Sequence, residues 1–202
     1  MPHRRSLSPT RPLSLCCCQI KAWKAGHKGK CKAAARADTR TAAKPTADQM
    51  RVLEILEQLA GAADWRGVAA QEGAARAVAA ALRTSMPGCA SWVYCTLGIS
   101  YQSQEDFAKA IKYHTQHLAI AKEVGDRAGE GMAHGSLGNA YQSQGDFAKA
   151  IEYHTQRLAI AKEVGDRAGE ERAYANLGTC LMHLNEYVKA VAYFEAQHGM
   201  AM

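Results

Sequence analysis

The chain has 202 residues, of which 48% are hydrophobic, 22% charged and 7% aromatic. This composition supplies enough apolar side chains for one or two cores and excludes a fully disordered protein. Its uninterrupted apolar runs are only a few residues long, well short of the roughly 20 residues that cross a bilayer. We therefore expect a soluble protein of the cytoplasm or nucleus, with no membrane partner.

The net charge of +6 hides an uneven distribution. Residues 1–45 carry eleven Lys and Arg against the single acid Asp38, a net of +10, whereas the remainder carries fourteen basic and eighteen acidic residues, a net of −4. A basic head therefore precedes a mildly acidic body. The head leaves open an alternative function as a nucleic-acid-associated or transcriptional regulator, although the acidic body argues against nucleic acid as the main partner.

The head divides by composition into three segments. Residues 1–15 are predicted to form a basic disordered tail, and residues 33–47 a linker. The tail is rich in Arg and Ser and has no acid, as organelle transit peptides do. A solvated basic tail is the favoured interpretation.

Between the tail and the linker, residues 16–32 concentrate metal-binding side chains. Residues 18–31 resemble the second half of a MYND-type zinc finger, and the matching positions are Cys18, Gln19, Trp23, Lys24, Gly26, His27 and Cys31. Thiolates and imidazole suit a tetrahedral zinc ion. The resemblance implies zinc as a cofactor, held by Cys18, His27 and Cys31.

The front half of such a finger is missing, since Ser14 stands where the family has a cysteine. Three interpretations stay open. The cysteines are free thiols in a basic arm, or Cys16 or Cys17 completes one zinc site with the three matched ligands, or the first 15 residues replace a lost upstream half. In each case we expect a reducing compartment, because clustered thiols without a signal peptide favour metal over disulfides.

Residues 48–86 are predicted to form a degenerate helix pair. Leucines at three-residue spacing precede an Asp64-Trp65 turn, and apolar residues from Val68 to Leu82 follow it. We expect Pro87-Gly88 to break the helix before the regular body begins.

The body is built from internal repeats. Residues 97–130 recur at 137–170 with 29 of 34 positions identical and a period of 40, and a decayed third copy occupies 171–198. We therefore divide the body into repeats at 91–130, 131–170 and 171–202, the last one truncated. A hairpin with one apolar stripe cannot bury that stripe alone, whereas stacked copies can, which is typical of a solenoid.

Each repeat is predicted to form two antiparallel helices. In the second copy we expect helix A over about 131–143 and helix B over about 147–164. Asp146 suits the start of helix B, and Gly165 suits a left-handed end of it. The predicted apolar stripe comprises Phe147, Ala150, Ile151, His154, Leu158 and Ala161 on helix B and Leu137, Ala140 and Tyr141 on helix A.

These residues resemble the tetratricopeptide repeat, in particular the 40-residue variety of G-protein-signalling modulators. The matching positions are Leu97, Gly98, Tyr101, Phe107 and Ala110, and then Leu137, Gly138, Tyr141, Phe147 and Ala150. The resemblance implies an all-α solenoid of about 3.5 helical hairpins that binds a protein or peptide on its concave face, lined by helices A. It also implies that Asn139 and Arg172 hold an extended peptide by its backbone, although hydrogen bonds between repeats would explain them equally well.

Further inner positions in the same register are Ile99, Gln102, Gln142 and Thr179. A chaperone-type carboxylate clamp is not expected, because Gly135 replaces the lysine one turn before Asn139. Since no phosphate-binding or metalloprotease motif occurs, we expect a non-enzymatic scaffold. His154 recurs one period after His114, and these two histidines and His117 are interpreted as packing positions. The sequence leaves the oligomeric state open.

Overall fold

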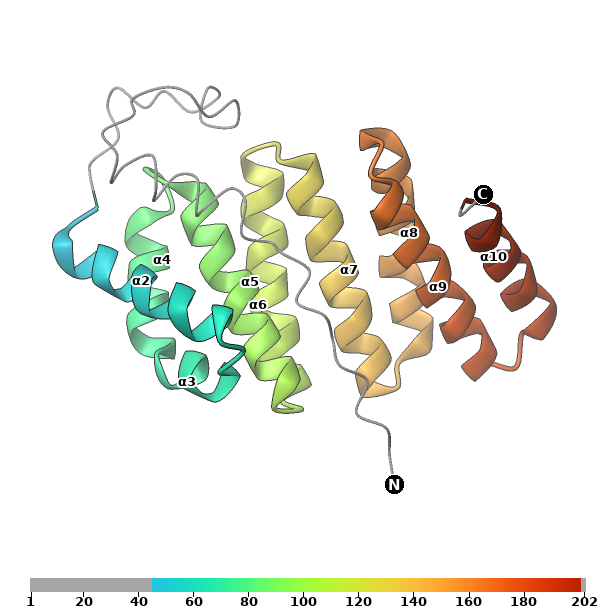
Figure 1. Cartoon of the computed structure of the whole chain (residues 1–202), viewed down its shortest axis with the longest axis horizontal. Coiled ribbons are helices and arrows are strands. Elements are labelled where there is room, and N and C mark those ends of the chain that lie inside the picture. Colours follow the sequence, from blue (N-terminus) through green and yellow to red (C-terminus); the bar gives the residue numbers. More distant parts are fainter. Residues whose placement is uncertain (1–44, 201–202) are drawn as a thin grey trace. The chain divides into compact units, whose positions relative to one another are not determined.

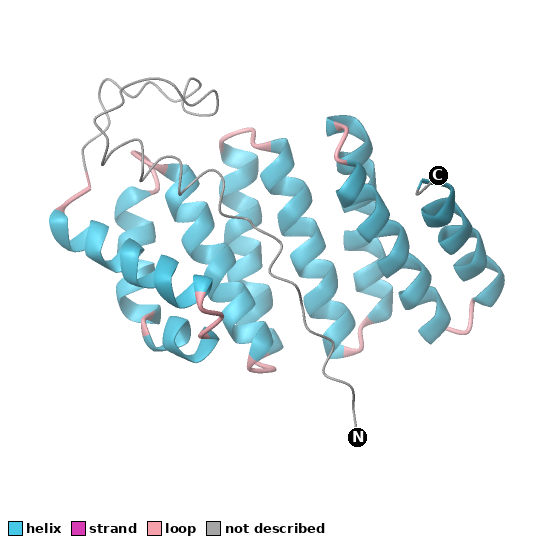
Figure 2. Cartoon of the chain, in the orientation of Figure 1, coloured by secondary structure: helices cyan, strands magenta, loops and turns pink. Residues whose placement is uncertain are grey.

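The computed structural model describes residues 45–200, and this part of the chain consists of helices joined by short turns, without a strand (Figures 1 and 2). The prediction of an all-α hairpin solenoid is confirmed. The helices are α2 (Ala47–Gly61), α3 (Trp65–Ala70), α4 (Glu72–Leu82), α5 (Pro87–Ser103), α6 (Phe107–Glu123), α7 (Arg127–Gln144), α8 (Phe147–Val164), α9 (Arg167–His183) and α10 (Tyr187–Met200).

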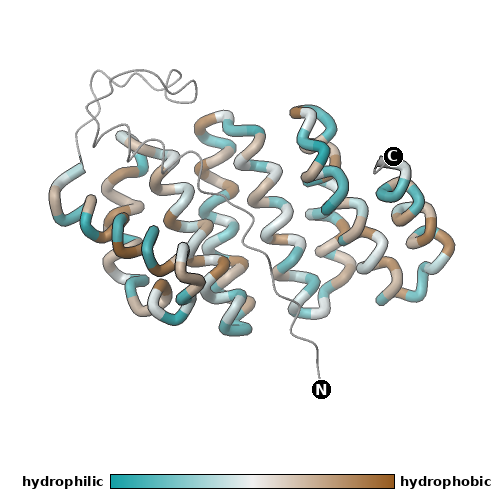
Figure 3. The backbone as a smooth tube through the Cα atoms, in the orientation of Figure 1, coloured by the Kyte–Doolittle hydropathy of each residue, from teal (hydrophilic) through white to brown (hydrophobic). Residues whose placement is uncertain are grey.

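Three regular hairpins follow one another in this array. We call α5–α6, α7–α8 and α9–α10 the first, second and third repeats, with α5, α7 and α9 as the A helices and α6, α8 and α10 as the B helices. Each A helix packs on its own B helix; α7 and α9 also pack on the preceding B helix, and α5 packs on α3 and α4. Apolar and polar segments alternate along the helices, as expected of helices buried on one side (Figure 3).

Aspartates cap the N-termini of α3, α6, α7, α8 and α9. Each accepts a hydrogen bond, 2.9–3.1 Å long, from the backbone N–H three residues later, and the residues are Asp64, Asp106, Asp126, Asp146 and Asp166. The predicted cap at Asp146 is confirmed. The prediction that helix A begins near 131 is wrong, because Asp126 caps a helix that starts at Arg127. Asp166 caps α9 in the same way.

Residues with a left-handed backbone conformation, at positive φ, lie in the turns between helices. Gly165 adopts a φ of 72° and ends α8, as predicted. Between helices A and B the same conformation falls on Glu105, Gly145 and Asn185, with φ of 63°, 88° and 61°. Only the second repeat has glycine at this position, where a Cβ is disfavoured.

The helices α2, α3 and α4, which we call the N-terminal unit, contain the predicted turn, but the predicted second helix is not continuous. Asp64 caps a helix that stops at Ala70, and α4 starts two residues later, so Gln71 divides the expected helix into α3 and α4. Leu53 and Leu56 of α2 are fully buried. Pro87, expected to lie in a break, is the first residue of α5, where its missing N–H has no partner to lose.

Small residues let the helices of a repeat approach closely. A Cβ added at Gly98 would lie 2.4 Å from His114, and one added at Gly138 would lie 2.6 Å from His154. Both histidine rings are fully buried. The predicted stripe is therefore correct in placing His154 in the core; Ala150 and Ala161 are buried with it, whereas Phe147, Ile151 and Leu158 are half-buried.

The B helices of the second and third repeats differ in whether a neighbouring helix packs against their first residues. Phe147 at the start of α8 stacks on His183 of α9, with ring centroids 4.3 Å apart. At the equivalent position in α10, Tyr187 is 53% exposed, and Val188 beside it is 87% exposed. The apolar outer side of α10 is thus uncovered within the part of the chain that the structure describes.

Candidate functional site

The A helices form a continuous layer. α5 contacts α7 and α7 contacts α9, whereas successive B helices approach each other less closely. We call the surface formed by the predicted inner positions of α5, α7 and α9 the A-helix face. Its residues lie on rigid helices rather than on loops, so their spacing is fixed by the packing of the repeats.

Asn139 lies exposed on α7 and is joined to α9. The Nδ2 of Asn176 donates to the Oδ1 of Asn139 over 3.0 Å. The pair therefore forms a bond between repeats and leaves the Asn139 amino group and the Asn176 carbonyl oxygen for other partners. Sequence reasoning missed Asn176, although it stands immediately before the Leu-Gly pair of the third copy, where the first two copies have Thr96 and Ser136.

One turn further along, Gln142 makes a second link between the same helices. The Sγ of Cys180 lies 3.5 Å from the Gln142 Oε1 and donates to it. Burial raises the pKa of Cys180 to about 11, so this group stays a protonated donor at neutral pH. The neighbouring Thr179 donates its hydroxyl to the Ala175 carbonyl over 2.9 Å and so keeps it within its own helix.

Arg172 lies one turn before Asn176 and is exposed. Its Nε donates to the Ala168 carbonyl over 3.0 Å, which turns the guanidinium along its own helix. Arg172, Asn176 and Cys180 follow a four-residue spacing and therefore share one side of α9. On α5, Ile99 and Gln102 are half-buried at the positions equivalent to Asn139 and Gln142.

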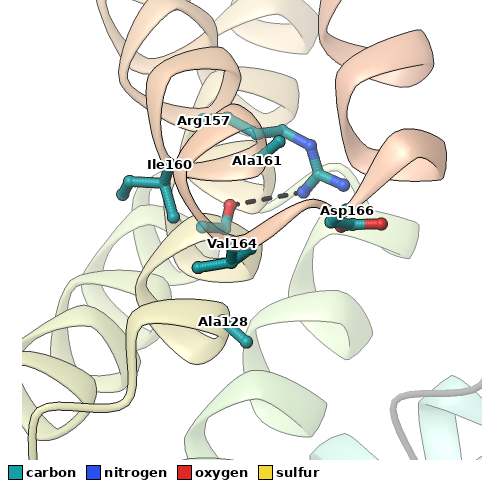
Figure 4. Close-up of a pocket in the computed structure, with 7 residues that line it drawn as sticks. Ala128, Arg157, Ile160, Ala161, Val164 and Asp166 are labelled. Carbon is teal, nitrogen blue, oxygen red and sulfur yellow. Dashed lines mark hydrogen bonds between the residues drawn. The ribbon is translucent and has the colours of Figure 1, made fainter.

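Arg157 of α8 lines a small pocket together with residues at the starts of α7 and α9 (Figure 4). Its Nη1 donates to the Gly131 carbonyl over 3.3 Å and its Nε to the Gly169 carbonyl over 3.4 Å. Burial lowers the pKa of this guanidinium. The side chain thus ties three helices together, which is a structural role.

The same arginine explains the glycine that replaces the expected clamp lysine. A Cβ at Gly135 would lie 2.3 Å from the Arg157 Nη1. In the first repeat Cys95 and His117 take these two positions. The second repeat therefore has a small residue on helix A where its B helix carries a large cation.

The buried histidines are packing positions, as interpreted from the sequence. His114 and His154 are 0% exposed and His117 is 3% exposed. Burial lowers the pKa of His114 to about 3 and those of His117 and His154 to about 4, so all three are neutral at physiological pH. No cluster of three or more His, Cys, Asp or Glu able to hold a metal occurs among residues 45–200.

The predicted zinc ligands Cys16, Cys17, Cys18, His27 and Cys31 lie outside the described residues. Zinc binding stays a prediction, as does the resemblance to a MYND-type finger. Across residues 45–200, none of the helices combines the length and the apolarity that a bilayer crossing requires.

Comparisons with known proteins agree with this architecture. The crystal structure of the TPR domain of Arabidopsis FLU matches 54% of this chain and 92% of its own, with a TM-score of 0.52 and 26% identity. No match was found among curated proteins. Nothing in these comparisons distinguishes the modulator-like variety of repeat from others.

The family model for the tetratricopeptide repeat matches residues 89–163 and again residues 129–197. The two matches overlap and together span the three regular hairpins. The chain therefore belongs to the tetratricopeptide repeat family.

Proposed function

We propose that the protein is a non-enzymatic scaffold that binds an extended segment of a partner protein along its A-helix face. The observation that carries this proposal is the amide pair of Asn139 and Asn176. The pair offers one free amino donor and one free carbonyl acceptor, which matches the alternating C=O and N–H groups of an extended backbone.

The surroundings of the pair support the same function. Arg172, one turn away, is exposed and presents a cation for a carbonyl or carboxylate of the bound segment. Ile99, Gln102, Gln142 and Thr179 continue the surface with mixed polar and apolar character. Tetratricopeptide repeat arrays bind protein segments in such grooves, and no catalytic motif competes for the role.

To test the proposal, a partner would first be identified by proximity labelling. Its affinity for the purified chain would then be measured by calorimetry. Asn139→Ala and Arg172→Ala are each expected to weaken binding about five- to tenfold, the loss typical of one hydrogen bond to a ligand. Gln156→Ala, an exposed change on α8, is the control and should leave the affinity unchanged. Equal affinity in all three variants would overturn the A-helix face as the binding surface.

We also propose that the head binds one zinc ion through Cys18, His27, Cys31 and either Cys16 or Cys17. Elemental analysis of protein purified without added metal should then give about one zinc per chain, and Cys31→Ala should lose it. Protein without zinc would contradict this proposal and favour free thiols in a basic arm.

The alternative function, nucleic-acid association through the basic head, differs in its response to salt. Contacts to phosphates release counterions, so DNA affinity would fall steeply between about 50 and 200 mM salt. Capture of a peptide by the amide pair should change little over that range. Tight, salt-sensitive DNA binding that is lost when the head lysines are replaced would favour the alternative.

A further inference from the structure

Two tyrosines of the first repeat hold a carboxylate. The hydroxyls of Tyr101 on α5 and Tyr113 on α6 both donate to Glu72, one to each carboxylate oxygen. The two rings are stacked with their centroids 5.7 Å apart and an interplanar angle of 18°. The chain itself thus shows what this pair of hydroxyls can bind.

Cations support this carboxylate. The Arg76 Nη1 lies 3.7 Å from the Glu72 Oε1, and the Lys109 Nζ lies 4.6 Å from the centre of the Tyr101 ring. The two tyrosine hydrogen bonds are the main cause that lowers the pKa of Glu72, and Lys109 and Arg76 act in the same direction. Glu72 is therefore held in its charged form.

The second repeat contains the same pair without the carboxylate. Tyr141 and Tyr153 stack with their centroids 5.3 Å apart and an angle of 8°. Lys149 lies 5.2 Å from the centre of the Tyr141 ring and bridges Asp146 over 3.0 Å, just as Lys109 bridges Asp106 over 3.3 Å in the first repeat.

The two tyrosine pairs differ in how far their side chains are exposed to solvent. Tyr101 and Tyr113 are buried, with 7% and 2% of their surface exposed. Tyr141 and Tyr153 are both half-buried, and neither hydroxyl has a hydrogen-bond partner among residues 45–200. An accessible pair of phenol donors, preorganised by ring stacking and next to a lysine, is complementary to a carboxylate.

This pair lies away from the A-helix face. Tyr141 is two residues beyond Asn139 on α7, which places the two side chains about 160° apart around the helix axis. The third repeat has lost the pair, because Leu181 stands at the position of Tyr141. The second repeat is therefore the one place in the described array where the pair is both complete and open.

We propose that Tyr141 and Tyr153 form a second docking site that binds the side-chain carboxylate of an Asp or Glu in a partner protein. An acidic side chain is the expected ligand for two reasons. The equivalent tyrosine pair of the first repeat binds the carboxylate of Glu72, and Lys149 adds a positive charge beside the open pair. The basic head is a poor source of this group, because Asp38 is the only acid among residues 1–44. The site does not depend on the peptide groove proposed above.

The test uses the full chain labelled with [13Cζ]tyrosine and followed by NMR. The probe is an acetylated and amidated tetraglutamate, whose only carboxylates are on side chains, and the matched peptide is the tetraglutamine. Tetraglutamate should shift the Tyr141 and Tyr153 signals and bind about tenfold more tightly than tetraglutamine. Blocked peptide ends separate side-chain recognition from recognition of a chain terminus.

The variant Tyr141→Phe/Tyr153→Phe keeps the stacked rings and removes only the hydroxyls, so it should fold normally and lose the preference for tetraglutamate. Tyr187→Phe removes an exposed hydroxyl elsewhere and should leave that preference intact. Equal binding of the two peptides by the unchanged chain, or the same preference in the double variant, would overturn the proposal. Tighter tetraglutamate binding by Asp38→Asn would also overturn it, since the chain's own acid would then occupy the site.

Discussion

The first and second repeats share most of their sequence but lie in two different environments. Residues 97–130 and 137–170 are identical at 29 of 34 positions, and the B helices, their aspartate caps and the stacked tyrosines correspond. The first repeat is covered by the N-terminal unit, whose Glu72 binds both tyrosines, whereas the second repeat leaves its tyrosines accessible. The repeat sequence therefore determines the hairpin, and the preceding helices determine which of its polar groups remain free.

Two of the five differences between residues 97–130 and 137–170 concern the core, Ser100 against Ala140 and His117 against Arg157. His117 is buried and neutral in the first repeat, whereas Arg157 in the second donates to two backbone carbonyls. Each of these two repeats also contains two buried imidazoles, His114 and His117 in the first and His134 and His154 in the second. Burial lowers the pKa of all four, so both repeats should be sensitive to acid.

Acid should give the largest effect. Because burial lowers the pKa of His114 to about 3 and those of His117 and His154 to about 4, the folded state binds fewer protons than the unfolded state. Their stabilising effect is complete above the unfolded pKa of about 6.5 and is lost as the pH falls below it. At pH 5 each histidine should lower the free energy of unfolding by about 2 kcal/mol, which urea titrations at pH 7.5 and pH 5 would measure.

Phenylalanine supplies the control for this effect, since Phe194 is the natural residue at the equivalent position of the third repeat. His154→Phe should reduce the loss of stability between the two pH values by about 2 kcal/mol. A loss of stability that is unchanged by His154→Phe would refute the assignment of acid sensitivity to these imidazoles.

Filling the close contacts between helices should have the next largest effect. Gly98→Ala and Gly138→Ala place a methyl 2.4 Å and 2.6 Å from buried histidine rings, and each should cost about 1–3 kcal/mol of stability. Gly73→Ala is the matched control, because nothing lies within 4 Å of a Cβ there. That helical site should instead gain about 0.5–1 kcal/mol. Thermal and urea unfolding of the three variants would measure these changes in stability.

Removing the negative charge of Glu72, which binds Tyr101 and Tyr113, should have a smaller effect on the free energy of unfolding. Glu72→Gln weakens two charge-assisted hydrogen bonds and should cost about 1 kcal/mol. It should also lower the pKa of Tyr101 from about 12, since Glu72 contributes to that rise after burial. Absorbance titration at alkaline pH measures the second effect. An unaltered Tyr101 titration would show that Glu72 does not engage the hydroxyl in solution.

The smallest effect concerns the turn between helices A and B. Glu105 adopts a φ of 63° where the second repeat has Gly145, so Glu105→Gly should stabilise the first repeat by about 0.5–1 kcal/mol. The reverse change, Gly145→Glu, should destabilise the second repeat by a similar amount. Chemical denaturation of both variants would test this, and a destabilised Glu105→Gly would contradict it.

Much of the fold could be predicted because the repeat supplies its own evidence. Period, turn aspartates and the Gly165 cap all follow from comparing the copies. The split at Gln71 could not be predicted, because the N-terminal unit has no second copy, and the first turn of α7 was missed because Asp126 resembles a loop residue as much as a cap.

The candidate site was predicted in part. Asn139 and Gln142 lie on one surface with Arg172, but their partners on α9, Asn176 and Cys180, depend on how neighbouring repeats are rotated. The contact of Glu72 with two tyrosines 29 and 41 residues away likewise depends on how helices distant in the sequence pack together. Such contacts follow from packing between repeats and leave no local pattern in the sequence.

Site-specific photo-crosslinking can show directly whether partners bind the A-helix face. A benzophenone side chain introduced at Thr179 on α9 should crosslink a partner protein in cells, and Asn139→Ala should reduce the yield. The same group at Ala159, exposed on α8, should give little product. Equal yields from the two positions, or a yield at Thr179 that Asn139→Ala leaves unchanged, would contradict the account.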